Sequence, residues 1–299
     1  MFHFKKICAI VVTYNRLELL KLTIEKLLKQ ARKIDEIIVI NNASTDGTQE
    51  FLEEIKDQVT VESLSENLGG AGGFSAGIKC AYEKGYDYFW IMDDDTIVKE
   101  DSLEMLEVGL ERFSDKKIGF LASNVLFKDD KPCIMNVPHL YKEDWNEYAG
   151  EGYLRLNAAS FVSVLVSREA VKEVGLPIKE FFIWGDDIEF TERISSKFEC
   201  YFVSKSIVYH YMNENKGVDL INECPARVNR HFYDIRNKFY VAKSRGGKTL
   251  FGYFKYVAKL TLNIIFKAKE GKGKKLKVVV KGFFKGIMFN PSIQYIDKK

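Results

Sequence analysis

The chain has 299 residues, 46% of them hydrophobic and 29% charged, a composition that suits a folded globular protein and excludes disorder of the whole. Its formal net charge of +3 hides an asymmetry, because residues 243–299 hold fourteen lysines, one arginine and two acidic residues, hence +13, which leaves −10 for residues 1–242. The five cysteines are scattered without a C-x-x-C pair, which argues against a disulfide framework or a zinc site and fits a reducing compartment.

The apolar run that follows Lys5 and Lys6 is too short for a signal sequence, and no stretch of eighteen apolar residues occurs. We therefore expect a cytoplasmic protein.

Strand and helix patterns alternate over the first 95 residues. Apolar, β-rich runs predict strands over 7–12, 36–40, 59–64 and 88–92. Helical spacing of apolar residues predicts helices over 17–28, 48–56 and from the glycine-rich segment to about 84. Such alternation predicts right-handed βαβ units and a mostly parallel, Rossmann-like α/β sheet.

Polar residues follow each of these strands, at 13–16, 41–46, 65–70 and 93–95. Ligands of parallel α/β sheets bind beyond the carboxyl ends of the strands. The coincidence predicts a ligand cleft at this edge.

Three consecutive carboxylates end the fourth run. Side chains alternate along extended backbone, so Asp93 and Asp95 face one way and Asp94 the other. Two carboxylates on one side suit a hard divalent cation. The alternative is a solvated acidic turn that opens a helix over 102–110.

A glycine-rich segment, 67–77, follows the third strand. Glycines let backbone N–H groups approach a phosphate closely, and the start of a helix adds a favourable dipole. The segment lacks the P-loop pattern, and a flexible loop is the alternative.

The pattern weakens after residue 121, and 127–153 is interpreted as long loops. A short helix is expected over 168–174. Aromatic residues then lead through Trp184 to Asp186 and Asp187 at the start of another helix. An apolar wall favours protonation of a carboxylate and suits a general base, although acids are also common at helix starts for dipole reasons.

Two short strands are expected over 200–203 and 206–211, the second presenting His210; a lone histidine is more often packed than a ligand. A helix is expected to run to about 243, and its basic residues either form a solvated face or meet an anionic acceptor: Arg227, Arg230, His231, Arg236 and Lys238.

The tail, 249–299, mixes lysines with apolar residues at helical spacing, as in amphipathic helices that lie on an anionic membrane surface. The alternative is a helical bundle that packs on the catalytic domain or on a second subunit, in a homo-oligomer.

With these segments together, the sequence resembles glycosyltransferase family 2, inverting enzymes of the GT-A fold. The resemblance covers roughly residues 7–240. It rests on five segments: Val-Val-Thr-Tyr-Asn-Arg at 11–16, Asn-Asn-Ala-Ser-Thr-Asp-Gly-Thr at 41–48, Asn-Leu-Gly-Gly at 67–70, Asp-Asp-Asp at 93–95 and Asp-Asp-Ile-Glu at 186–189. Segments 67–74, 181–193 and 233–240 look most like its galactofuranosyltransferase and rhamnosyltransferase branch. It implies a catalytic domain over 1–242, with a nucleotide-binding half over 1–95 and an acceptor half over 96–242, and a basic helical tail over 243–299.

Carried onto this chain, the resemblance implies that Asp93, Asp95 and His210 hold Mn²⁺ or Mg²⁺. It implies Asp187 as the base, with Asp186 and Trp184 beside it. The nucleotide-binding residues that it implies are Thr13, Asn15, Arg16, Asn41, Asn42, Asp46, Asn67, Gly70, Gly72, Gly73 and Asp94. Relatives usually carry Asp where Asn41 stands, at the position that reads the pyrimidine, but an amide oxygen still accepts from ring N3–H.

The expected reaction is sugar transfer to a hydroxyl of a lipid-linked or growing cell-surface glycan, with peripheral contact at the inner face of the membrane. UDP-galactofuranose is the first choice of donor, dTDP-rhamnose the second, and a UDP-hexopyranose a third. A metal-dependent nucleotidyltransferase or phosphohydrolase is the rival enzyme. A nucleic-acid-binding protein is disfavoured, because an acidic body repels a polyanion.

Overall fold

The computed structural model describes residues 5–296, which divide into two compact units. The first unit contains residues 5–179, 187–216 and 293–296, and the second contains residues 180–186 and 217–292.

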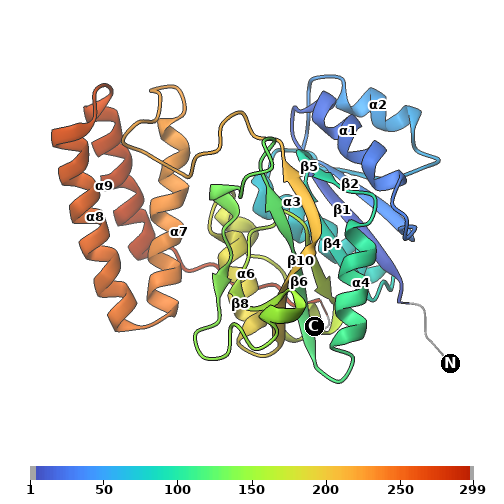
Figure 1. Ribbon diagram of the computed structural model, residues 1–299. Helices are drawn as coiled ribbons and strands as arrows, with labels where there is room; N and C mark the ends of the chain where they lie inside the picture. Colours follow the sequence, from blue (N-terminus) through green and yellow to red (C-terminus); the bar gives the residue numbers. More distant parts are fainter. Residues whose placement is uncertain (1–4, 297–299) are drawn as a thin grey trace. The chain divides into compact units, whose positions relative to one another are not determined.

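A ten-stranded sheet forms the first unit, in the order β3-β2-β1-β4-β9-β6-β10-β8-β7, with β5 paired to β10 (Figure 1). The strands are β1 (Ile7–Thr13), β2 (Glu36–Asn41), β3 (Thr60–Ser63), β4 (Tyr88–Asp93), β5 (Thr96–Val98), β6 (Ile118–Leu126), β7 (His139–Leu140), β8 (Tyr153–Ala158), β9 (Val164–Ser167) and β10 (Glu199–His210). The run β3-β2-β1-β4 is parallel throughout, which confirms the predicted βαβ units.

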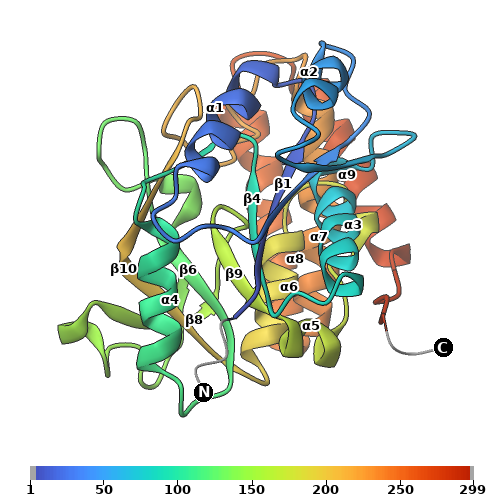
Figure 2. The ribbon, with the colours of Figure 1, turned by 90° about the vertical axis from the view of Figure 1, so that its right-hand side faces the viewer.

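Helices cover both faces of this sheet, and the strand sequences explain why. The helices are α1 (Leu17–Leu28), α2 (Thr48–Glu54), α3 (Gly69–Glu83), α4 (Ser102–Arg112), α5 (Arg168–Val174) and α6 (Asp186–Ser195). Alternate residues of β1 enter two separate cores: Ile7, Ala9 and Val11 pack with α1, α2 and α4, while Cys8, Ile10 and Val12 pack with α3, α5 and α6. Figure 2 shows α4 and α3 on opposite sides of β1. A strand buried on both faces must be apolar along its whole length.

The second half of the sheet differs from the prediction. The two short strands expected over 200–203 and 206–211 form one strand, β10, whose register on β6 shifts between Val203 and Ile207. The small apolar stretch 156–167 contributes the antiparallel strands β8 and β9, and β9 lies between β4 and β6. These pairings join segments far apart in the chain, so local periodicity does not reveal them.

Helices α7 (His231–Ser244), α8 (Gly247–Lys267) and α9 (Lys272–Met288) form the second unit (Figure 1). Helix α9 packs closely on α7, because a side chain at Gly282 or Gly286 would collide with Ile235 or Phe239. The family resemblance implied a catalytic domain that extends to residue 242. Residues 217–242 share a core with the tail helices, since Ile235 and Phe239 pack with residues of α8 and α9. None of the helices within residues 5–296 is long and apolar enough to cross a membrane.

Candidate active site

The first unit brings three predicted metal ligands together. Asp93 ends β4, Asp95 directly precedes β5, and His210 ends β10. Antiparallel pairing of β5 with β10 sets His210 opposite Thr96, so the imidazole arrives beside Asp95. One ligand atom from each of the three side chains lies within 4.8 Å of the others. These three side chains therefore converge as a metal site requires.

The charges in this cluster perturb one another strongly. Burial, with the neighbouring charge of Asp95, raises the pKa of Asp93 to about 7. Burial also acts to raise the pKa of Asp95, but contact with His210 and the charge of Arg16 outweigh it and hold that pKa below its usual range. Burial acts to lower the pKa of His210, yet Asp95 and Asp93 raise it to about 10.

The side chains fit a divalent cation. Oδ1 of Asp95 is buried and has no hydrogen-bond partner among the described residues, although Nε2 of His210 lies 3.2 Å away. The other ring nitrogen of His210, Nδ1, lies 2.8 Å from Oδ1 of Asn136. Two carboxylates and an imidazole suit Mn²⁺ somewhat better than Mg²⁺.

Asp94 and Arg16 lie next to the three predicted metal ligands and connect them to the loop that follows β1. The hydroxyl of Thr13 donates to Oδ2 of Asp94 at 2.8 Å. The guanidinium of Arg16 pairs with Asp95 and lies 3.5 Å from Oδ1 of Asp94. Thr13 and Asp94 thus fix the start of the loop after β1, and Arg16 offsets the negative charge of the acids.

The loops that follow β1 and β2 are tied together. The N–H of Asn15 donates to Oγ of Ser44 at 3.0 Å, and Oδ1 of Asn15 accepts from the N–H of Thr45 at 2.7 Å. Asp46 accepts from the N–H of Leu17 at 3.0 Å. Predicted nucleotide-binding residues of two separate motifs therefore share one hydrogen-bond network.

The buried Asn41 uses both ends of its amide inside its own loop. Its Oδ1 accepts from the N–H of Ser44 at 3.0 Å, and its Nδ2 donates to Gln49 at 2.9 Å. These bonds explain why an amide suits this position, since a carboxylate offers no donor to Gln49.

Asn42 and Asn67 connect this network to the glycine-rich helix. Asn42 accepts from the N–H of Leu68 at 2.8 Å and donates to the carbonyl of Gly69 at 2.9 Å. Asn67 accepts from the N–H of Gly69 at 2.8 Å. They hold the start of α3 beside the end of β2.

Two glycines of this segment have a packing role. Gly72 and Gly73 lie buried inside α3, where a side chain would collide with Leu68 and Val12 respectively. Both are therefore required for close packing, and their role in binding the nucleotide stays a prediction. Gly70 has open space around it, with the nearest atom, of Phe74, at 3.9 Å.

The aromatic segment before α6 belongs to the second unit and has an unusual backbone. Phe182, Trp184 and Gly185 all have positive φ, of 65°, 66° and 85°. The buried Asn237 of α7 holds this conformation by donating at 2.8 to 3.1 Å to three main-chain carbonyls, those of Phe181, Ile183 and Trp184. This role of Asn237 was not predicted, although the Arg-Asn pair of the 233–240 segment was a signal for it.

The expected basic face of α7 is only partly available to an anion. Arg236 donates to the carbonyls of Glu180 and Phe181 and stacks on Phe289 at 3.9 Å. Burial lowers the pKa of Arg236 to about 10. Arg236 is therefore a structural residue of the second unit.

The two acids that follow begin α6. Asp186 is buried, and Oδ1 of Asp187 accepts from the N–H of Ile188 at 2.7 Å. Asp187 thus lies in the first turn of α6, and its role as the base stays a prediction.

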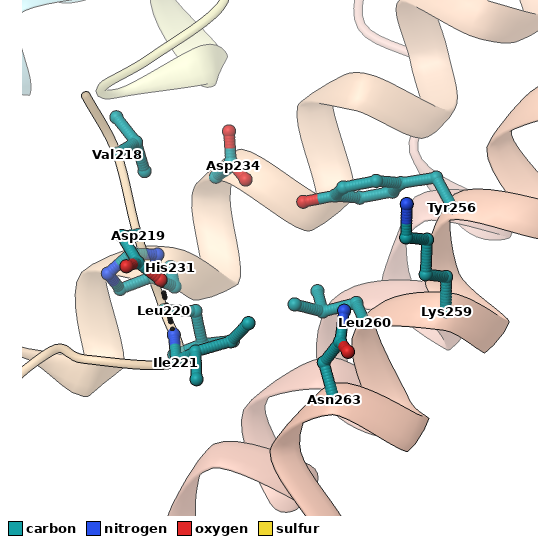
Figure 3. Close-up of a pocket in the computed structure, with 10 residues that line it drawn as sticks. All are labelled: Val218, Asp219, Leu220, Ile221, His231, Asp234, Tyr256, Lys259, Leu260 and Asn263. Carbon is teal, nitrogen blue, oxygen red and sulfur yellow. Dashed lines mark hydrogen bonds between the residues drawn. The ribbon is translucent and has the colours of Figure 1, made fainter. Parts of the chain in front are cut away.

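A cavity of about 280 Å³ lies in the second unit, and His231 is among the residues that line it (Figure 3). Asp234 faces it from α7 and Tyr256 and Lys259 from α8, and Leu220 and Leu260 line it on the apolar side. The carboxylate of Asp234 is already paired with Lys238 at 2.8 Å.

Comparison with known proteins gives one family. The model of the family described as glycosyl transferase family 2 matches residues 8–169. Galactofuranosyltransferase GlfT1 of Mycolicibacterium smegmatis is 29% identical over 206 residues, 65% of this chain and 67% of the relative. The Mycobacterium tuberculosis enzyme of the same name is 25% identical over 84% of this chain and 88% of its own length. Poly-β-1,6-N-acetyl-D-glucosamine synthase of Staphylococcus aureus is 29% identical over 67% of this chain, a match that covers 47% of the length of that synthase.

Solved structures share the fold. The crystal structure of S. aureus TarS 1-349 superposes on 95% of this chain and on 72% of the TarS chain. The TM-score is 0.55 and the sequence identity is 15%. GalNAc-T7, solved with UDP, GalNAc and Mn²⁺, matches 85% of this chain and 55% of its own with a TM-score of 0.59 at 16% identity. At such identities the likeness speaks for the fold alone.

Proposed function

The chain belongs to glycosyltransferase family 2, and we propose that it transfers galactofuranose from UDP-galactofuranose to a hydroxyl of a lipid-linked or growing cell-surface glycan. One observation carries the transferase chemistry: Asp93, Asp95 and His210 meet at the strand edge where the loops after β1 and β2 are joined. Support for the donor comes from the two GlfT1 relatives, the second of which is matched over 88% of its length.

In the proposed reaction Asp187 accepts the proton of the acceptor hydroxyl. The acceptor oxygen attacks the anomeric carbon from the face opposite the diphosphate, the bond from that carbon to the diphosphate oxygen breaks, and the configuration inverts. A divalent cation held by Asp93, Asp95 and His210 would stabilise the negative charge that develops on the departing diphosphate. The loops that carry Thr13, Asn15 and Asn42 would bind the nucleotide.

A donor screen tests the proposal. Purified protein with Mn²⁺ and a lipid-linked saccharide acceptor is offered UDP-galactofuranose, dTDP-rhamnose, UDP-galactopyranose and UDP-glucose in parallel, and released nucleotide and lengthened glycan are both measured. We expect glycan extension with UDP-galactofuranose, lost in Asp93→Ala. Extension with dTDP-rhamnose alone would assign the rhamnosyl alternative instead, and release of free sugar or inorganic phosphate without extension would refute the transferase reaction.

We further propose that the second unit rests on an anionic membrane surface, where a lipid-linked acceptor is found. Helices α8 and α9 together carry ten lysines and no acidic residue. Phe266 and Met288 are 78% and 77% exposed. The exposed large apolar residues of the two helices are Phe251, Phe254, Tyr256, Leu262, Ile265, Phe266, Val280, Phe284, Ile287 and Met288. Each lysine near an anionic bilayer contributes about 1 kcal/mol.

Liposome co-sedimentation of the full chain tests this contact. Deleting the tail would expose the core shared with α7, so point variants are the better test. We expect binding to vesicles that contain phosphatidylglycerol, weakened in Phe251→Ser/Phe266→Ser and unchanged in Val108→Ser, a matched change of an exposed apolar residue on α4. Equal binding of all three proteins would overturn the membrane proposal while leaving the donor assignment untouched.

A further inference from the structure

We infer that Asn136 is a positioning residue for His210: its amide oxygen keeps a proton on Nδ1 and so directs the lone pair of Nε2 toward the cation site. This inference rests on the proposed function, because the cation site is proposed there. It adds a residue from the region 127–153, for which the sequence predicted only long loops.

The contact itself is short and protected from water. Oδ1 of Asn136 lies 2.8 Å from Nδ1 of His210, and the two residues are 9% and 7% exposed. Sγ of Cys133 is the other atom near Nδ1, at 3.9 Å. A carbonyl oxygen only accepts, so Nδ1 must hold the proton of this hydrogen bond. In a neutral imidazole Nε2 then has the free lone pair that a metal requires.

The other end of the amide is also anchored, which restrains the side chain. Nδ2 of Asn136 donates to Oγ of Ser160 at 2.8 Å. A flipped amide would point Nδ2 at the ring, move the proton to Nε2 and make Nε2 a donor to Asp95. Oδ1 of Asp95 lies 3.2 Å from Nε2 and still has no hydrogen-bond partner within residues 5–296. Both atoms belong to the ligand set of Asp93, Asp95 and His210, so a cation bound there would take the place of any proton between Nε2 and Oδ1.

Fixing the ring in advance has a measurable consequence. A histidine ligand whose second nitrogen is held by an acceptor is already in the correct tautomer and orientation, and loss of such a partner typically weakens metal binding about 10- to 100-fold.

The experiment is a titration of the full chain with Mn²⁺ alone, without nucleotide sugar. Free Mn²⁺ is measured at each step by its electron paramagnetic resonance signal. We expect Asn136→Leu, which has similar volume and no acceptor, to raise the Kd about 10- to 100-fold. Asn136→Asp keeps an acceptor and should stay within about threefold of the wild type. Asn157→Leu is the matched control, since this partly buried residue of β8 contacts Glu192 and should leave the Kd unchanged.

Each outcome decides the inference. Equal Kd values for the wild type and Asn136→Leu, or equal weakening in Asn136→Leu and Asn136→Asp, would overturn it. If Asn136→Leu does not fold, Ser160→Ala takes its place: it releases the amide, so a weaker Kd supports the inference and an unchanged one rejects it. If the wild type binds no Mn²⁺, or binds it with the same Kd as Asp93→Ala, the cation site itself is refuted, and with it this part of the proposed function.

Discussion

Metal binding should compete with protons at this site, and the competition gives a prediction with a definite sign. The pKa of His210 is raised to about 10 and that of Asp93 to about 7, so both groups hold protons under mildly acidic conditions. A cation needs Nε2 of His210 and a carboxylate oxygen of Asp93 deprotonated. Lowering the pH therefore weakens Mn²⁺ binding, and raising the pH strengthens it.

The magnitude follows from the two pKa values. Between about pH 8 and pH 6 the proton displaced from His210 costs about tenfold in affinity per pH unit, hence about 100-fold. Asp93 passes from mostly ionised to mostly protonated over the same range, which raises the Kd for Mn²⁺ by about another tenfold. We expect the Kd for Mn²⁺ to rise about 1000-fold in all.

The assay is isothermal titration calorimetry in buffers of different ionisation enthalpy, which also counts the protons released. At about pH 8 one proton should leave for each Mn²⁺ bound, and near pH 6 close to two. His210→Gln should bind more weakly but lose about one proton from each count. An affinity that stays level across this range would refute the coupled arrangement of Asp93 and His210.

The remaining predictions concern the base, the glycine-rich helix and the membrane-facing surface. Asp187→Asn should retain nucleotide binding but lose about 10²- to 10⁴-fold in turnover, and near-normal turnover would exclude Asp187 as the base. Gly73→Ala should destabilise the protein relative to Gly70→Ala by about 1–3 kcal/mol in chemical denaturation, because its methyl group collides with Val12 whereas Gly70 has room. Equal stabilities would contradict the packing role. Phe266→Ser alone should reduce liposome binding without changing the free energy of unfolding by more than about 0.5 kcal/mol, since its side chain is exposed.

Local sequence patterns predicted the first half of the fold, because burial there leaves a mark on consecutive residues of each strand and helix. The strand β1 is apolar along its length since it is buried on both faces, and that property is visible in the sequence. The same reasoning failed for β8 and β9, whose neighbours in the sheet lie far away in the chain. It also did not reveal the packing role of Gly72 and Gly73, because a glycine required for packing and one required for phosphate look identical in a sequence.

The order of residues was enough to predict that acids end the buried strand β4, because a run of carboxylates after apolar residues is visible without coordinates, and motif order implied His210 as their partner. That the imidazole lies beside Asp95 became known from the fold, because the pairing of β5 with β10 joins positions more than a hundred residues apart. The contact of Asn136 with His210 also became known only from the fold, because the residues around Asn136 in the sequence have no clear periodicity. Hydrogen bonds and ligand distances depend on how distant segments are brought together, and chain order does not encode that distance directly.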